Sequence, residues 1–242
     1  MSTDISKFLD STYLKESTEL GISEKENQKI VKEFILDGIK MDCACLMIRP
    51  NFVQLAYDLI AKASSSVKIG TVIDFPFGNA STEEKIKEAN SVIVNGAYDL
   101  DFVCDYNAFK RGSFEKFDND ILLCTKLGLA NKKIVKWIIE TGALSKAEIR
   151  KISIRIHHII SSEFNKDLQK VFIKTSTGYY GGSGAMIKDI KAIKSVCGDL
   201  SVKASGGVSD LSQCLAMIEA GASRIGTSKA LKIYNEKKLN EL

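Results

Sequence analysis

The stretch YDLDFVCDYNAFKRGSFEKFDNDILLCTKLGLANKKIVKWIIE (98–140) contains two short apolar runs separated by a longer charged segment. The runs at 98–104 and 133–140 have the length and the Val, Ile and Phe content of buried β-strands. The segment at 113–129 has the apolar spacing of an amphipathic helix. This order of strand, helix and strand is typical of one β/α unit followed by the strand of the next.

The same alternation recurs along the chain. Strands are predicted at 7–14, 43–48, 67–75, 98–104, 133–140, 171–176, 200–205 and 223–227. Helices are predicted at 24–38, 51–64, 81–95, 113–129, 145–160, 184–197, 209–220 and 228–239. A chain of 242 residues is close to the roughly 250 that one (β/α)8 barrel needs, so we expect the α/β class and a single TIM-barrel domain over residues 1–242.

An open, doubly wound sheet is the alternative arrangement of eight such units. That class usually carries a G-x-G-x-x-G motif after its first strand, and this sequence has none there. The Gly-rich GYYGGSGA (178–185) follows the sixth predicted strand and lacks that spacing. We therefore expect a closed barrel with its active site at the C-terminal ends of the strands.

Composition and charge exclude several classes of protein. The chain is 45% hydrophobic and 26% charged with two prolines, which is typical of an ordered globular protein. Its net charge is +4 and its basic residues are spread out, which argues against nucleic acid and membrane surfaces as partners. The six cysteines form no C-x-x-C, no histidine cluster suggests a metal, and the N-terminus MSTDISKFLD lacks a signal peptide. We expect a cytoplasmic protein that acts on small molecules.

Strand alternation places charged side chains inside the predicted barrel. The side chains that face the helices must be apolar, so the other set of each strand points inward. In DLDFVC (99–104) the inward set contains Asp99 and Asp101. The same rule applied to IVKWII (134–139), VFIKTS (171–176) and LSVKAS (200–205) turns a lysine inward from each strand: Lys136, Lys174 and Lys203.

Buried charges are costly, which suggests that these residues have a function. Two neighbouring cations each favour deprotonation of the other, and burial acts in the same direction. A lysine is a nucleophile only as a neutral amine, so Lys174 beside Lys203 fits a lysine activated for Schiff-base formation. The alternative is a structural network in which the lysines only neutralise Asp99 and Asp101.

The segments that carry these residues resemble the deoxyribose-phosphate aldolase family. They are TVIDFPFGN (71–79), GAYDLDFV (96–103), KWIIETG (136–142), FIKTSTG (172–178), VKASGG (202–207) and RIGTS (224–228). The most specific of them is FIKTSTG. All six follow the order of the family, and the likeness runs nearly from end to end.

The resemblance implies a class I aldolase of carbohydrate catabolism that uses neither metal nor cofactor. Such an enzyme reversibly cleaves 2-deoxy-D-ribose 5-phosphate to acetaldehyde and D-glyceraldehyde 3-phosphate through a lysine Schiff base. The resemblance makes Lys174 the Schiff-base residue and Lys203 the cation that activates it. It makes Asp101 the residue that moves protons through a water, and Lys136 a residue that orders the network. Asp10, retained from the first strand of the family, is expected to support the site.

Phosphate is expected where the last strands end, because glycine turns and helix N-termini offer backbone N–H groups to anions. The candidate residues are Gly178, Gly206, Gly207, Gly226 and Ser228. Many relatives read ASGGIR and RIGTSSG, where this chain reads ASGGVSD (204–210) and RIGTSKAL (224–231). Ser209 thus replaces a frequent arginine, and Lys229 a frequent serine. Lys229 joins the phosphate candidates, with a solvent-facing lysine as the alternative reading.

Two other functions are compatible with the same residues. One is a Schiff-base aldolase of this family that acts on a different or unphosphorylated aldehyde or sugar. The other is a catalytically silent barrel that binds sugar phosphates. The expected partners are deoxyribose 5-phosphate, acetaldehyde and glyceraldehyde 3-phosphate, with a homo-oligomer left open and with nucleic acid and membrane excluded.

Overall fold

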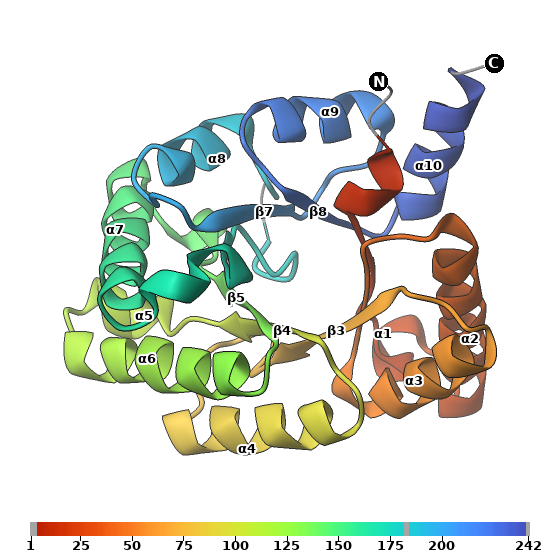
Figure 1. Ribbon diagram of the computed structural model, residues 1–242, viewed down its shortest axis with the longest axis horizontal. Coiled ribbons are helices and arrows are strands. Elements are labelled where there is room, and N and C mark those ends of the chain that lie inside the picture. The colour runs from red at the N-terminus through yellow and green to blue at the C-terminus, as the bar shows by residue number, and fades with distance from the viewer. Residues whose placement is uncertain (1–3, 182–183, 241–242) are drawn as a thin grey trace.

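The structure, a computed structural model, describes residues 4–181 and 184–240, in which eight parallel strands close into a barrel surrounded by helices (Figure 1). The strands are β1 (Leu9–Tyr13), β2 (Cys45–Ile48), β3 (Lys68–Ile73), β4 (Asp99–Val103), β5 (Ile134–Ile138), β6 (Val171–Lys174), β7 (Ser201–Ser205) and β8 (Arg224–Thr227). Each strand pairs with the next along the chain, and β8 pairs with β1, so the barrel has no free edge. The predicted (β/α)8 barrel is confirmed.

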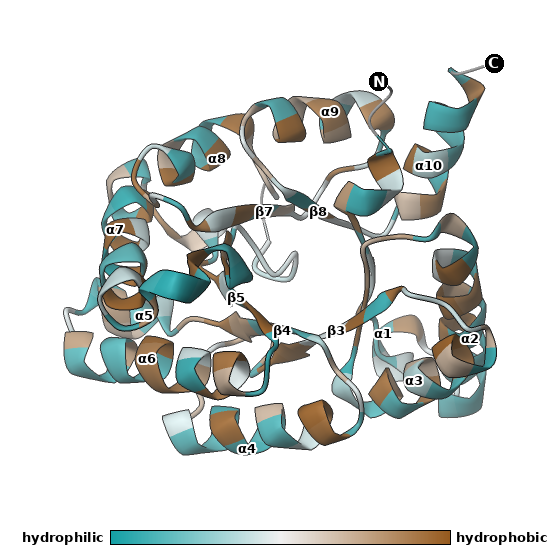
Figure 2. Ribbon diagram, viewed as in Figure 1, coloured by the Kyte–Doolittle hydropathy of each residue, from teal (hydrophilic) through white to brown (hydrophobic). Residues whose placement is uncertain are grey.

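Helices follow the strands around the outside of the barrel. They are α1 (Ser17–Leu20), α2 (Glu24–Met41), α3 (Val53–Lys62), α4 (Thr82–Val94), α5 (Tyr106–Lys110), α6 (Phe114–Ala130), α7 (Lys146–Glu163), α8 (Ile187–Lys194), α9 (Leu211–Glu219) and α10 (Ala230–Leu239). Short 3-10 helices occur at Ile5–Phe8, Pro50–Phe52, Thr141–Ala143 and Asn165–Lys170. Hydrophobic and hydrophilic bands alternate along the helices in Figure 2, as expected for helices with one buried face.

Three of the long helices begin at the same local signal, a serine followed three residues later by a glutamate. In α2 the Ser23 side chain accepts from the backbone N–H of Glu26, while the Glu26 carboxylate accepts from the backbone N–H of Ser23. Ser81 and Ser145 form the same capping box at the start of α4 and α7. These boxes satisfy N–H groups that would otherwise lack a partner, which sets the first residue of each helix.

The predicted boundaries differ from the structure by one or two residues at both ends of the strands. Lys7 and Phe8, predicted as strand, belong to the 3-10 helix Ile5–Phe8, because the Asp4 side chain accepts from the N–H of Ser6 and caps that turn. The second strand begins at Cys45 instead of residue 43, because α2 ends at Met41 and its C-cap residue Asp42 lies in the left-handed region with φ of 50°. Predicted strand residues 74–75, 139–140 and 175–176 lie in loops.

The helix predicted at 184–197 is shorter in the structure, where α8 covers only Ile187–Lys194. Residues 182 and 183 of the Gly-rich segment, like 1–3 and 241–242 at the ends of the predicted domain, lie outside the described residues. Within the described part of the chain, no helix combines the length and hydropathy that a membrane span needs.

The core has two layers of different chemistry. Between the strands and the helices lies a large apolar layer in which Trp137 stacks on Phe102, with ring centroids 5.1 Å apart. Inside the barrel a much smaller apolar cluster, Leu14, Cys45, Met47 and Val72, covers only part of the space. The remaining interior positions include charged side chains, and these define the site.

Candidate active site

Lys174 is the last residue of β6 and points into the barrel, as strand alternation predicts. It is only 2% exposed, and its backbone lies beside that of Lys203 in the register of β6 and β7. The Nζ of Lys174 donates to Oδ2 of Asp101 at 2.9 Å. The expected pair of neighbouring lysines is therefore present, with a carboxylate in contact with the first of them.

Asp101 is the centre of the arrangement because it accepts from three lysines. Its Oδ2 accepts hydrogen bonds from the Nζ atoms of Lys174 and Lys203, each at 2.9 Å, and its Oδ1 accepts one from Nζ of Lys136 at 3.0 Å. Burial alone would raise the pKa of Asp101, but the three lysines outweigh it and hold that pKa well below its ordinary value. Asp101 is thus a fully buried carboxylate at neutral pH.

Two further carboxylates, Asp10 and Asp99, lie nearer the N-terminal ends of the strands than Asp101. Lys203 lies 2.6 Å from Oδ2 of Asp10, and Lys136 lies 2.5 Å from Oδ2 of Asp99. Arg224, the first residue of β8, donates to Oδ1 of Asp10 at 2.8 Å. Burial opposes the ionisation of Asp10, but Lys203, Lys136 and Arg224 lower its pKa to about 2. Asp10 is therefore an ionised partner of Lys203 and Arg224, and its supporting role in the site stays a prediction.

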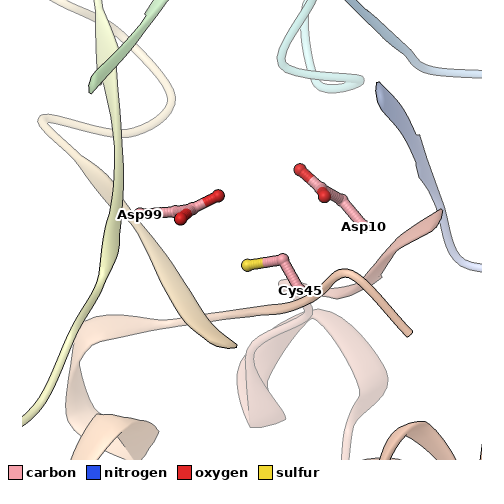
Figure 3. Close-up of side chains that lie close together, drawn as sticks. All are labelled: Asp10, Cys45 and Asp99. Carbon is pink, nitrogen blue, oxygen red and sulfur yellow. The ribbon is translucent and has the colours of Figure 1, made fainter. Parts of the chain in front are cut away.

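The side chains of Asp10, Cys45 and Asp99 converge in the barrel, as Figure 3 shows, with ligand atoms within 4.8 Å of one another. Such a set could in principle hold a metal ion. However, both carboxylates are already in contact with cations of the chain, and burial raises the pKa of the Cys45 thiol well above its ordinary value. A metal would have to displace ammonium groups, so these residues fit the ion-pair network better than a metal site.

The pKa of Lys174 is lowered to about 8 by several opposing effects. Burial is the largest and lowers the pKa, the neighbouring carboxylate of Asp101 raises it, and the cation of Lys203 lowers it. The direction agrees with the expectation from sequence, although burial contributes more than the second lysine. At pH 7 about a tenth of Lys174 is then a free amine, far more than for an ordinary lysine.

Three of the glycines proposed for phosphate lie together in one pocket of about 120 Å³. Gly178, Gly206 and Gly207 line it with Glu140 and Ser176, beside the C-terminal ends of β5, β6 and β7. All three glycines have positive φ, at 85°, 97° and 77°, a conformation that other residues rarely adopt. The pocket therefore exposes backbone that side chains would otherwise cover.

Gly226 lies elsewhere, within β8. A Cβ at this position would fall 2.9 Å from Cε of Lys203 and 2.8 Å from Oγ of Ser205. Gly226 therefore makes room for the Lys203 side chain, and it does not line the glycine pocket. A glycine at this position therefore lets Lys203 reach its carboxylate partners.

Ser228 and Lys229 occupy the exposed turn between β8 and α10 and do not line the pocket either. Thr227 connects this turn to the neighbouring loop, because its Oγ1 accepts from the N–H of Lys229 at 2.9 Å and donates to the carbonyl of Val208 at 2.5 Å. Val208 directly follows Gly206 and Gly207. The turn is thus held beside the glycine pocket without forming its wall.

Comparison with known proteins decides the family. A deoxyribose-phosphate aldolase of Thermococcus gammatolerans is 36% identical over 231 residues, 95% of each chain. One of Staphylococcus saprophyticus is 40% identical over 229 residues, 94% of each chain. The chain belongs to the deoxyribose-phosphate aldolase family. Its membership rests on these relatives, since no family model matches the chain.

Solved structures agree with this assignment. An aldolase called QR15 matches this family member with a TM-score of 0.83 and 32% identity, over 99% of this chain and 98% of that one. A tetrameric deoxyribose phosphate aldolase from Aeropyrum pernix matches with a TM-score of 0.78 and 25% identity, over 97% and 91% of the two chains. The predicted enzyme class, an aldehyde-lyase, is confirmed.

Two residues of this aldolase were not assigned from the sequence. Arg224 could have been found, because Ile225 faces the apolar layer and alternation then turns Arg224 inward. Glu140 could not, because nothing in the sequence predicts its left-handed backbone with φ of 55°. Its carboxylate accepts from both the N–H and the hydroxyl of Thr177, which fixes the loop that follows Lys174.

Proposed function

We propose that this chain is a cytoplasmic class I aldolase, with one catalytic domain, that reversibly cleaves 2-deoxy-D-ribose 5-phosphate to acetaldehyde and D-glyceraldehyde 3-phosphate. The observation that carries the proposal is the environment of Lys174. Its Nζ lies 2.9 Å from Asp101 inside the barrel, and burial contributes most to a pKa of about 8. An amine at this position suits nucleophilic attack on an aldehyde.

In the cleavage direction, the Nζ of Lys174 adds to the aldehyde carbon of the open-chain sugar, and loss of water forms a cationic imine. The C3 hydroxyl then gives up its proton, the C2–C3 bond breaks, and its electron pair moves toward the imine nitrogen to form an enamine. Glyceraldehyde 3-phosphate leaves at this stage. Protonation of the enamine at C2 and hydrolysis of the imine release acetaldehyde and restore the amine.

The neighbouring side chains support these proton transfers. Asp101 is ionised and accepts hydrogen bonds from three lysines. It orients a water through which protons move to and from the substrate. Lys203 supplies a cation next to Lys174 that favours the amine, and we assign to it the return of protons, which its hydrogen bond to Asp101 supports. Lys136 bonds to both Asp99 and Asp101 and keeps Asp101 in place.

Reduction with borohydride in the presence of acetaldehyde tests the proposal. Peptide mapping by mass spectrometry should find an ethyl group on Lys174, because borohydride reduces the imine to a stable secondary amine. Lys85 is a matched internal control, since it is also fully buried but pairs with Asp120 outside the barrel interior. An efficient adduct on another lysine, with Lys174 unlabelled, would overturn the mechanism.

A substitution at Lys229 tests the phosphate handle. Charge-assisted contacts of roughly 1.5–3 kcal/mol predict a preference of about 10- to 100-fold in kcat/KM for the 5-phosphate over free deoxyribose. Lys229→Ser should shrink this ratio, because Lys229 is a cation in the turn held beside the glycine pocket. The measurement is kcat/KM for both substrates in wild type and variant.

Lys238→Ser is the control, because Lys238 lies in the last turn of α10, the helix that follows Lys229, over the ring of Tyr234. It should leave the preference unchanged. A Lys229→Ser ratio equal to wild type would show that Lys229 points to solvent. A wild-type ratio near one would favour an unphosphorylated substrate and would leave the Schiff base intact.

A further inference from the structure

The ion pairs of the barrel interior form one continuous network. Within the part of the chain that the structure describes, it joins four cationic side chains to three carboxylates: Lys136, Lys174, Lys203 and Arg224, with Asp10, Asp99 and Asp101. Apart from Arg224, all of them are buried, so water contributes little to compensating their charges. The network is electrically neutral when Lys174 is an amine and the other six groups are ionised.

Arg224 lies at the opposite end of this network from Lys174. It is the first residue of β8, whereas Lys174 is the last residue of β6. Its side chain is 22% exposed, and its Nη1 lies 2.8 Å from Oδ1 of Asp10 and 3.9 Å from Asp99. These contacts of the guanidinium are with Asp10 and Asp99, and none of them is with Lys174.

A chain of short contacts nevertheless connects Arg224 to Lys174. Oδ1 of Asp10 accepts a hydrogen bond from Arg224, and Oδ2 of Asp10 lies 2.6 Å from the Nζ of Lys203. Lys203 also donates to Asp101, which in turn accepts from Lys174, both at 2.9 Å. Each step is an ion pair no longer than a normal charge-assisted hydrogen bond.

We propose that Arg224 is a positioning residue of the aldolase reaction: it holds Asp10 so that Lys203 stays beside Asp101 and Lys174. Its positive charge also completes the neutral balance of the interior. The inference rests on the proposed function, because it requires Lys174 as the nucleophile. Arg224 acts through Asp10 and Lys203 and not on the substrate.

Loss of the guanidinium should change the protonation of Lys174. The interior would then carry an excess negative charge whenever Lys174 is an amine, and buried negative charge favours protonation of a nearby lysine. Two other titratable groups interact with the network. Burial raises the pKa of the Cys45 and Cys43 thiols above the ordinary value, and the Asp10 carboxylate acts in the same direction on both. Neither supplies the missing positive charge.

The test is the pH dependence of kcat/KM for Arg224→Met. Its acid limb should move to higher pH by about one unit, so that kcat/KM at pH 7 falls about tenfold, with kcat affected more than KM. Arg224→Lys keeps the charge, so its acid limb should lie close to the wild-type pH. Asp99→Asn removes one negative charge from the same network and should move the limb to lower pH. A purely structural defect would not shift two variants in opposite directions.

Arg155→Met is the matched control, because Arg155 makes a two-point ion pair with Asp118 on the outer helices. It should leave the limb in place. An unmoved limb in Arg224→Met, or one that moves the same way in Asp99→Asn, would overturn the inference. If Arg224→Met does not fold, Arg224→Lys and Asp99→Asn still decide it. Failure to trap Lys174 in wild type would overturn the proposed function as well, whereas a trapped Lys174 with an unmoved limb overturns only the inference.

Discussion

Lys174→Ala is expected to lose at least about 10⁴-fold in kcat, because the amine that forms the imine is removed and covalent catalysis ends. The variant should also lose the borohydride adduct with acetaldehyde. Turnover of deoxyribose 5-phosphate and mass mapping after reduction measure the two losses. A variant that kept either one would show that another group is the nucleophile.

The Lys174→Ala protein should remain folded. Asp101 keeps two of its three partners, Lys136 at 3.0 Å and Lys203 at 2.9 Å, so no unpaired charge is left in the interior. Lys170→Ala is a suitable control, because Lys170 directly precedes β6 and makes an exposed ion pair with Asp167. It should retain wild-type turnover, and circular dichroism should show the same fold for both variants.

Lys203→Leu is expected to have the second largest effect. Removal of this cation eliminates the repulsion that lowers the pKa of Lys174 and leaves the Asp101 carboxylate to stabilise protonated Lys174 more strongly. Because burial remains, the pKa of Lys174 should rise from about 8 part of the way toward the value of an ordinary lysine. Since activity requires the amine and is lost as pH falls through this pKa, the acid limb of kcat/KM should move to higher pH. A rise of one to two units lowers kcat/KM at pH 7 by about 10- to 100-fold.

Lys85→Leu distinguishes this effect from the general cost of removing a buried lysine. Lys85 is also fully buried and pairs with Asp120 at 2.7 Å and Asp74 at 3.6 Å, but it lies outside the barrel interior. It should reduce stability without moving the acid limb. If the limb of Lys203→Leu also stayed in place, Lys203 would serve only in proton transfer and not in activating Lys174.

Alternation within a strand was enough to place the charged residues inside the barrel. In β4 the apolar Leu100 and Phe102 face the helices, which turns Asp99 and Asp101 inward. The same reasoning correctly turned Lys174 and Lys203 inward, and it would have found Arg224. It succeeded because the pattern repeats every two residues and the outer layer tolerates few polar side chains.

Local signals were less reliable at the ends of elements and in the loops. The capping boxes of α2, α4 and α7 are readable as serine followed by glutamate. The 3-10 turn over Lys7 was missed although the Asp4 cap that starts it is local. The left-handed backbone of Glu140 is not readable, because it depends on contacts specific to the folded chain. For the same reason the sequence did not show that Gly226, predicted as a phosphate residue from its motif, leaves room for the Lys203 side chain.

From its residues alone, this chain specifies eight strand and helix pairs and an interior with three lysines, of which Lys174 is the predicted nucleophile. Those features follow from patterns within single segments of the chain. Folding adds the convergence of three lysines on the one carboxylate of Asp101, and the link from Arg224 through Asp10 to Lys203. These contacts join residues as far apart as 10 and 224, and they depend on barrel closure and strand stagger, which bring distant positions to the same level of the interior. Burial, the main cause of the lowered pKa of Lys174, likewise arises only once the barrel has closed around that side chain.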